Sequence, residues 1–335
     1  MRAGVSPATV DRALNGRRGV SPANRQRVLK AACDLGYLPS DGTVALPSRP
    51  ARLRFLIPNV GNAFMAEVAE SITYFARNQP LVAACEVLPL DGIGPDSLEK
   101  ALDSLSDDTD GVGIITTDHP RSRAAITRLC EAGIRVVTIA SDVPATPRSA
   151  YIGIDNLVAG RMAAQVLGLF IGPRTGAIAV FFGSRAFDGH DARRAGFAAY
   201  FKTHQQDRLI LPPIATDEDG DRLYDEVKRL LRTTPDLAGV YCVGAGREGL
   251  VQALVQHDGS ARPAVVMHDL TRNSRRWLAE GYIDALIDQN AQLIGQRAVL
   301  DLLGAIASGG TRLPARAIEP RIILSENIPD GPILS

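Results

Sequence analysis

The feature that most constrains the fold is an alternation of short apolar runs with amphipathic stretches, which begins near residue 52 of the 335-residue chain. The apolar runs are rich in β-branched residues and predict buried strands at Arg52–Ile57, Leu81–Leu88, Gly111–Ile115, Arg135–Ile139, Ala177–Phe182, Gly239–Val243, Ala264–Met267 and Ile283–Ile287. The amphipathic stretches predict helices at Phe64–Asn78, Arg121–Ala132, Ala159–Ile171, Asp221–Leu231 and Gln292–Ala307. Strands that alternate with helices form parallel sheets covered by helices, so the sequence predicts an α/β body with two such sheets.

The first forty residues follow a different pattern. Two helix-start signals, Ser6-Pro7 and Ser21-Pro22, each place a capping hydroxyl before a proline at the first helical position. Apolar residues then repeat at helical spacing, and a glycine ends each stretch. Two short helices with a tight lead-in predict a small all-α helix-turn-helix unit at residues 1–40.

Charge is distributed unevenly between this unit and the rest of the chain. The formal net charge of the whole chain is zero. Residues 1–40, however, carry seven basic side chains against two acidic ones, namely Arg2, Arg12, Arg17, Arg18, Arg25, Arg27 and Lys30 against Asp11 and Asp34. A basic head on an acidic body indicates a module that faces nucleic acid.

The stretch AGVSPATVDRALNGRRGVSPANRQRVLKAACDLGYLPS resembles the DNA-binding head of lactose-repressor-family (LacI/GalR-type) regulators almost position for position. The resemblance implies that the helix Ser6–Asn15 enters the major groove of operator DNA. It implies base-reading positions at Pro7, Ala8 and Arg12, and phosphate contacts from Ser6, Thr9 and Asn15. The chemistry agrees, because an arginine can donate a bidentate pair to guanine and a helix N-terminus favours phosphate.

Two features depart from the family's pattern. Members usually carry about ten more residues before the turn, which supply the first helix of the motif, whereas three residues precede Gly4 here. Either the natural start lies upstream or the protein has lost tight DNA binding, and the complete recognition pattern favours the first interpretation. In the linker at 41–51, Leu46 falls where the family inserts a hinge-helix leucine into the minor groove. Gly42 and Pro47 oppose a helix there, so the sequence leaves the hinge helix open.

The body resembles sugar-binding proteins of the ribose-binding type and the effector domains of the same regulators. The segments that carry this resemblance are RFLIPNVGNAFM, RVVTIASDVP, YIGIDNLVAGRMAA, DARRAGF, VVMHDLT and IDALIDQN. The resemblance implies a periplasmic-binding-protein-like domain over 52–331, with two doubly wound lobes, three crossovers and the ligand between the lobes. Lobe one is expected to hold 52–150 and 290–318, and lobe two 151–289 and 319–331.

Matching of these segments also implies a ligand site for a small sugar or polyol. Its expected members are Asn62, Phe64, Arg193, Asp269 and Gln289, together with Asp142. A polyol requires paired donors and acceptors and an aromatic face, which this set provides. Asp142 is expected to replace a carboxylate that the family often places where this chain has Ala140. Gly244 stands where ribose binders often have asparagine, so the expected ligand is not simply ribose.

Several classes of protein find no support in the sequence. The four cysteines are scattered, which predicts neither a metal site nor a disulfide framework and favours a reduced, cytoplasmic compartment. No apolar run reaches membrane-spanning length, and no secretory signal is evident. His119 has no nucleophile or metal partner in a recognisable pattern and is interpreted as a loop histidine, and Asp155-Asn156 as a capping turn or lobe hinge. No cofactor motif or catalytic set is present.

Three hypotheses follow. The favoured one is a sequence-specific DNA-binding transcriptional regulator, a repressor of a carbohydrate-uptake or catabolic operon controlled by a small sugar or polyol. It is expected to act as a homodimer rather than a tetramer, because no leucine heptads follow the last predicted strand near Arg321–Leu324 to pair dimers. The second hypothesis is the solute-binding receptor of a sugar transporter, and the basic head and missing signal argue against it. The third is an α/β enzyme such as a sugar isomerase or hydrolase.

Overall fold

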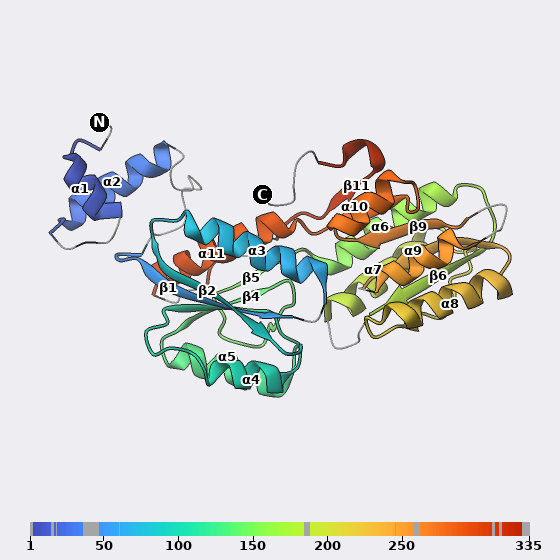
Figure 1. Ribbon diagram of the computed structural model, residues 1–335, viewed down its shortest axis with the longest axis horizontal. Helices are drawn as coiled ribbons and strands as arrows, with labels where there is room; N and C mark the ends of the chain where they lie inside the picture. The colour runs from blue at the N-terminus through green and yellow to red at the C-terminus, as the bar shows by residue number, and fades with distance from the viewer. Residues whose placement is uncertain are drawn as a thin grey trace.

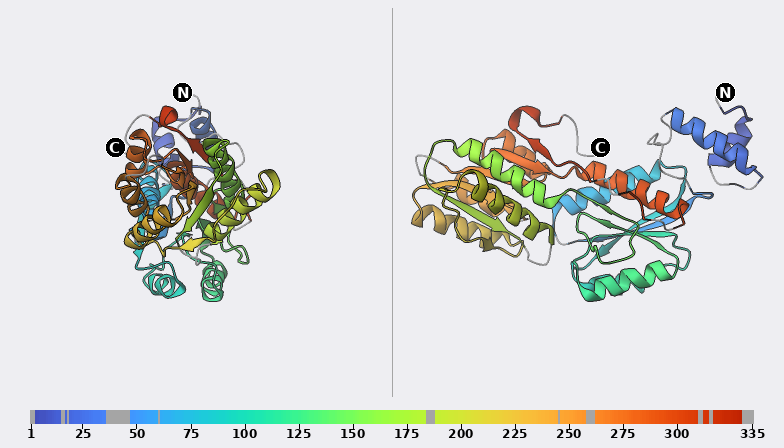
Figure 2. Two further views of the ribbon diagram at one scale, coloured as in Figure 1. Left: turned by 90° about the vertical axis from the view of Figure 1, so that its right-hand side faces the viewer. Right: turned by 180° about the vertical axis from the view of Figure 1, so that it is seen from behind.

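A computed structural model describes residues 3–14, 17, 19–35, 47–59, 61–183, 188–244, 246–257, 262–309, 312–314 and 317–329. A small helical head and two α/β lobes follow one another in a row (Figure 1). Figure 2 shows the same row from behind, with the head beyond the first lobe and away from the second.

The head consists of two helices that pack against each other. They are α1 (Pro7–Leu14) and α2 (Pro22–Asp34). Ser6 begins α1, because its Oγ accepts a hydrogen bond from the backbone N–H of Thr9 at 3.2 Å. Ala13 and Val28 are buried in the head. The two predicted helices are therefore present, and each begins at the predicted proline.

The first lobe is a five-stranded parallel sheet in the order β2-β1-β3-β4-β5. Its elements are β1 (Ala51–Pro58), α3 (Ala63–Arg77), β2 (Val82–Leu90), α4 (Pro95–Leu102), β3 (Gly111–Ile114), α5 (Pro120–Glu131), β4 (Arg135–Ile139), β5 (Ala150–Ile152) and α11 (Ala291–Ala307). Helices α3 and α11 cover one face of the sheet, and α4 and α5 cover the other (Figure 1).

The second lobe is a six-stranded sheet in the order β11-β10-β9-β8-β6-β7. Its elements are α6 (Asn156–Ile171), β6 (Ala177–Phe182), α7 (Asp188–His204), β7 (Ile214–Ala215), α8 (Gly220–Thr233), β8 (Leu237–Cys242), α9 (Arg247–Val255), β9 (Ala264–His268), α10 (Arg272–Ala279), β10 (Ala285–Asp288), β11 (Arg321–Ile323) and the short 3-10 helix Ser325–Asn327. Helices α6 and α7 cover one face, and α8, α9 and α10 cover the other. The edge strand β11 runs antiparallel to β10, whereas the other pairings are parallel.

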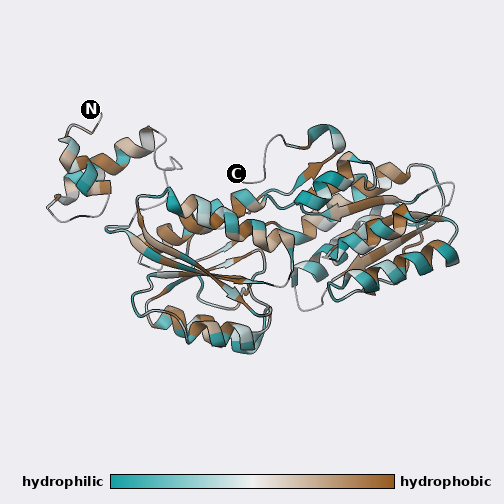
Figure 3. Ribbon diagram, in the orientation of Figure 1, coloured by the Kyte–Doolittle hydropathy of each residue, from teal (hydrophilic) through white to brown (hydrophobic). Residues whose placement is uncertain are grey.

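The central strands are apolar on both faces because helices cover both sides of each sheet. All residues of β3, β6, β8, β9 and β10 are buried. Figure 3 shows these strands in brown between helices whose outer faces are teal. The eight predicted strands are all present, and the α/β class with parallel sheets is confirmed.

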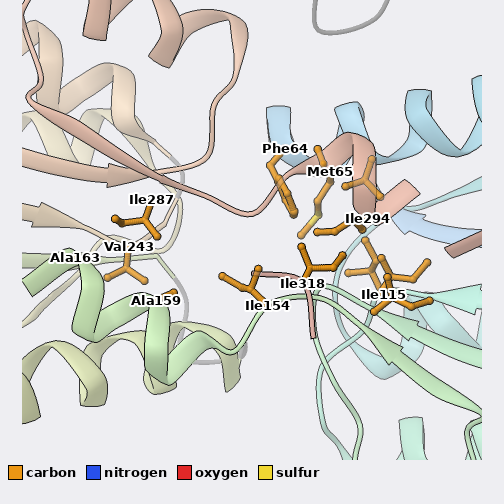
Figure 4. Close-up of a cluster of buried hydrophobic side chains, with 14 of the residues drawn as sticks. Phe64, Met65, Ile115, Ile154, Ala159, Ala163, Val243, Ile287, Ile294 and Ile318 are labelled. Atoms are coloured by element: carbon orange, nitrogen blue, oxygen red, sulfur yellow. The ribbon is translucent and has the colours of Figure 1, made fainter. Parts of the chain in front are cut away.

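The chain passes between the two sheets at residues 153–155, 289–290 and 318–320. Ile154 and Ile318 form a parallel bridge there, and Figure 4 shows their side chains between the apolar residues of the two lobes. Strand β5 belongs to the first sheet, so the first lobe continues to Ile152, two residues beyond the expected limit at residue 150.

Candidate functional site

A cavity lies between the lobes at the carboxyl ends of the strands of both sheets, where open α/β sheets bind ligands. It encloses about 530 Å³, including space that is open to solvent. Its lining residues come from both lobes and are Asn62, Phe64, Met65, Ile115, Ala140, Ser141, Gly189, His190, Arg193, Val243, Gly244, Arg247, Asp269 and Gln289. Five of the six predicted ligand residues therefore meet in one cavity.

The first lobe contributes an amide and an aromatic ring. Asn62 caps α3, and its Oδ1 accepts a hydrogen bond from the backbone N–H of Phe64 at 3.0 Å. Capping uses the carbonyl of the Asn62 amide, so its NH₂ group remains available as a donor. Phe64 is buried directly after the cap. On the same lobe, the buried hydroxyl of Ser141 has no hydrogen-bond partner among the described residues.

Arg193 reaches the cavity because helices α6 and α7 pack very closely. An ideal Cβ on Gly160 would lie 1.9 Å from the carbonyl oxygen of Arg193, and one on Gly196 would lie 2.1 Å from that of Leu157. This close packing places Arg193 beside Asn156, whose Oδ1 accepts from Arg193 Nε at 2.8 Å. The Arg193 side chain is thereby oriented, although it is almost entirely buried.

Asp269 and Gln289 come from the ends of two neighbouring strands. Asp269 follows β9 in the left-handed backbone region, with φ +66°, and its Oδ1 accepts from Gln289 Nε2 at 2.7 Å. Burial raises the pKa of the Asp269 carboxyl above its ordinary value. The buried Oε1 of Gln289 has no hydrogen-bond partner among the described residues. The pair therefore presents a carboxyl oxygen and an amide oxygen as acceptors.

Arg247 is a lining residue that sequence reasoning missed. It is the first residue of α9 and is buried, and Nη1 donates to the backbone carbonyl of His268. The distance from Nη1 to Asp269 Oδ2 is 3.7 Å. The available signal was its place three residues after Gly244, which directly follows the predicted strand Gly239–Val243.

Three buried rings, those of Phe197, Tyr241 and His268, pack against one another in the second lobe. The Tyr241 hydroxyl lies 2.7 Å from His268 Nε2, and Tyr241 stacks on Phe197 with ring centroids 4.4 Å apart. Burial, with the two cationic residues Arg193 and Arg247, lowers the pKa of His268 well below its ordinary value. His268 is therefore neutral at physiological pH and acts as part of the packing between β8 and β9.

The prediction for Asp142 is wrong. Asp142 does not line the cavity. Its carboxylate accepts from Arg148 through both oxygens, with Nε to Oδ1 at 2.5 Å, and from the Thr138 hydroxyl at 2.7 Å. The buried guanidinium of Arg148, six residues along the chain, thus holds this carboxylate within the first lobe, and Ala140 and Ser141 face the cavity instead.

The head presents most of the residues predicted to contact DNA on its surface. Ser6, Pro7, Ala8 and Arg12 are exposed and Thr9 is partly exposed, whereas Asn15 and Leu46 lie outside the described residues. By contrast, the exposed Arg17 pairs with Asp11 at 3.0 Å.

Other features singled out in the sequence have structural roles. The His119 side chain caps α5 by accepting from Arg121 N at 3.2 Å. Asp155 caps α6 by accepting from Leu157 N and Val158 N at 2.9 and 3.1 Å. Among the described residues, no cluster of three or more His, Cys, Asp or Glu residues could hold a metal ion. In the same part of the chain, no helix is long and apolar enough to cross a membrane.

A helix-turn-helix head joined to a two-lobed domain with a polar cavity defines the class of ligand-binding transcriptional regulators. Residues 54–311 match the family of periplasmic binding protein domains, and residues 1–40 match the lacI family of bacterial regulatory proteins. The chain belongs to the periplasmic-binding-protein-domain family and, through its head, to the lacI family of DNA-binding transcriptional regulators.

Curated relatives agree with this membership. The sucrose operon repressor of Lactococcus lactis subsp. lactis is 27% identical over 250 residues, which cover 72% of each chain. The HTH-type transcriptional regulator DegA of Bacillus subtilis (strain 168) is 28% identical over 201 residues, which cover 58% of this chain and 57% of that one. The regulator GntR of Escherichia coli (strain K12) is 30% identical over 171 residues, which cover 50% of this chain and 49% of GntR. All three are named as repressors or transcriptional regulators.

Solved structures share the fold of the body. A solute-binding protein from Burkholderia graminis C4D1M in complex with D-arabinose has a TM-score of 0.75 at 21% identity, covering 83% of this chain and 96% of that one. GanP, a glucose-galactose binding protein from Geobacillus stearothermophilus, has a TM-score of 0.72 at 20% identity, covering 84% and 99%.

Proposed function

We propose that this regulator represses an operon for carbohydrate uptake or catabolism, and that a small sugar or polyol in the cavity controls it. The observation that carries the proposal is a buried polar set whose hydrogen bonds are incomplete: Gln289 Oε1 and Ser141 Oγ lack protein partners among the described residues. Buried polar groups are normally paired, so such atoms favour a polar ligand. Hydroxyl groups, which both donate and accept, match the mixed set of Arg193, Asp269 and Gln289, and Phe64 adds an apolar face.

The ligand could control DNA binding because the residues of the cavity come from both lobes. Phe64 and Asn62 belong to the first lobe, and Arg193 and Asp269 belong to the second. A ligand that contacts both groups stabilises whichever arrangement brings the lobes closer. In a cytoplasmic homodimer, such a change would alter the spacing of two heads on the half-sites of a near-palindromic operator.

The test is a fluorescence-anisotropy titration of double-stranded DNA from the promoter region beside the gene, with and without a panel of pentoses, hexoses and polyols. We expect salt-dependent DNA binding that at least one of these compounds changes. Random DNA of equal length is the control. Sugar binding without any preference for the promoter DNA would favour the transporter-receptor hypothesis and contradict the proposal.

Light scattering tests the proposed assembly separately. We expect the mass of a dimer at micromolar concentration. A stable tetramer or a monomer under those conditions would contradict the proposed dimer.

A further inference from the structure

Among the described residues that line the cavity, there are more guanidinium groups than carboxyl groups. Two guanidinium groups, those of Arg193 and Arg247, face one carboxylate, that of Asp269. The three residues are 5%, 6% and 8% exposed, so solvent screens their charges poorly. Among the described lining residues, the remaining ionisable side chain is His190, whose Nδ1 lies 3.7 Å from Oε1 of Glu218. Among the described lining residues, the guanidinium groups therefore outnumber the carboxyl groups by one.

The two guanidinium groups also have more donors than the described residues use. A guanidinium carries five N–H donors. Arg193 makes one side-chain hydrogen bond to the described residues, from Nε to Asn156. Arg247 makes one to the His268 carbonyl, and its 3.7 Å separation from Asp269 Oδ2 is beyond hydrogen-bond length. Asp269 Oδ1 is instead occupied by Gln289. The ion pair between Arg247 and Asp269 is therefore loose, and no ion pair joins Asp269 to Arg193 among the described residues.

Three carboxyl groups lie just outside the lining, and Glu218 among them faces His190 rather than either arginine in the ion pairs of the described residues. Asp288 is committed to Arg321, at 3.1 Å from Nε to Oδ2, and to the backbone N–H of Leu270 at 3.1 Å. Glu67 lies on α3, and burial, with the charges of Asp269 and Asp288, raises its pKa to about 8. Glu67 is consequently mostly uncharged at neutral pH and leaves the excess positive charge uncompensated.

We infer that the natural effector is an acid: a polyhydroxylated molecule of monosaccharide size with one carboxylate, of the aldonate or uronate class. The inference rests on the proposed control by a sugar or polyol and specifies its chemistry. One carboxylate neutralises the single excess charge and matches the planar donor fork of a guanidinium. The hydroxyl groups of the same molecule suit the acceptors of Asp269 and Gln289 and the hydroxyl of Ser141.

The experiment is isothermal titration calorimetry on the full chain with matched acid and neutral probes. The pairs are D-gluconate with D-glucitol and D-glucuronate with D-glucose, and D-glucose 6-phosphate tests a phosphate source of negative charge. We expect one acid to bind about 10- to 100-fold more tightly than its neutral partner, because a charged hydrogen bond contributes more than a neutral one.

Variants at Arg247 show whether that residue causes the preference. Arg247→Met should lower the affinity for the acid far more than the affinity for its neutral partner, so that the acid-to-neutral ratio falls towards one. Arg247→Lys, which retains the charge, should keep part of the preference. Arg229→Met is the matched control, because Arg229 is exposed on α8 and pairs with Glu226 there. Thermal unfolding of each variant confirms that it is folded.

Three results would overturn the inference. A neutral probe that binds as tightly as its acid partner would refute the acid class while leaving sugar control intact. Tighter binding of the sugar phosphate than of either sugar acid would refute a carboxylate as the charged group of the effector. Absence of binding by every probe would refute the inference together with the proposed sugar control.

Discussion

Helices α6 and α7 approach so closely that a single methyl group should disturb the site. The ideal Cβ of an alanine at Gly160 would lie 1.9 Å from the carbonyl oxygen of Arg193, whereas ordinary contact begins at 3.4 Å. The obstructing atom belongs to the backbone and cannot rotate away. We therefore predict that Gly160→Ala separates the helices locally by about 1.5 Å, the difference between those distances.

This displacement should have two measurable effects. Overpacking of a well-packed interface costs about 1–3 kcal/mol in the free energy of unfolding. Arg193 also moves relative to Asn156, whose Oδ1 now lies 2.8 Å from Arg193 Nε. Since a hydrogen bond to a charged group contributes about 1.5–3 kcal/mol, ligand affinity should fall about 10- to 100-fold.

Urea unfolding measures the first effect, and calorimetry with the tightest-binding probe measures the second. Gly94→Ala is the control, because a Cβ at Gly94 meets nothing within 4 Å and the backbone there has φ −82°. We expect this variant to bind ligand like the unchanged protein, with a small loss of stability because alanine is a poorer N-cap of α4 than glycine. If Gly160→Ala unfolds and binds ligand like the unchanged protein, close α6–α7 packing does not position Arg193.

Three further predictions concern other parts of the chain. Arg12→Ala should weaken binding to the specific operator by about 1–3 kcal/mol in anisotropy titrations, whereas Arg17→Ala should have a small effect because Arg17 already pairs with Asp11. An equal loss of affinity for random DNA would refute base reading by Arg12. Asp269→Ala should weaken ligand binding by about 1–3 kcal/mol in calorimetry, because it leaves Gln289 unpaired, and normal binding would refute the site. The pKa of Glu67 is raised from 4.5 to about 8 in the fold, so its contribution to stability should be fully present below about pH 4.5 and be lost as the pH rises to about 8. Glu67→Gln should flatten that part of the plot of melting temperature against pH, and an unchanged plot would contradict the raised pKa of Glu67.

The architecture could be predicted from the sequence because long buried strands leave a clear pattern. All eight strands expected between Arg52 and Ile287 are present. Strands β5 and β7 were missed, since they contain three and two residues and are too short to show periodicity. Helices α4, α7, α9 and α10 were not among the predicted helices. For α9 the reason is similar, because nine residues that are mostly buried lack a polar face.

The site was predicted in part, and the errors have a common physical cause. Sequence position shows that a residue follows a strand, but the direction of its side chain depends on partners elsewhere. Asp142 turns into the first lobe because Arg148 pairs with it there. Arg247 turns into the cavity because the His268 carbonyl, at the end of another strand, accepts its hydrogen bond. Neither partner could be identified from spacing alone.

Capped and packed helices connect the cavity with the rest of the first lobe. Gln289 lies in a crossover, and the next residue, Asn290, caps α11 by accepting from Leu293 N at 3.2 Å. Helix α11 packs directly on α3, where the Ser71 hydroxyl donates to the Gln292 carbonyl at 2.9 Å. Helix α3 in turn begins at its N-cap, Asn62, which lines the cavity from the first lobe.

The anchoring of the linker determines what kind of motion these helices can transmit. Arg49, just before β1, pairs with Asp110 at 2.5 Å and so fixes the start of the body to the first lobe. The contacts among α3, α11 and the sheet are extensive and buried, and packed interfaces of this kind move as units. A ligand that binds Gln289 and Phe64 would therefore change the angle between the lobes rather than deform the first lobe. In a dimer, the separation of the two heads would then follow the rotation of whole lobes, and the strength of control would depend on how much more tightly the ligand binds one lobe angle than another.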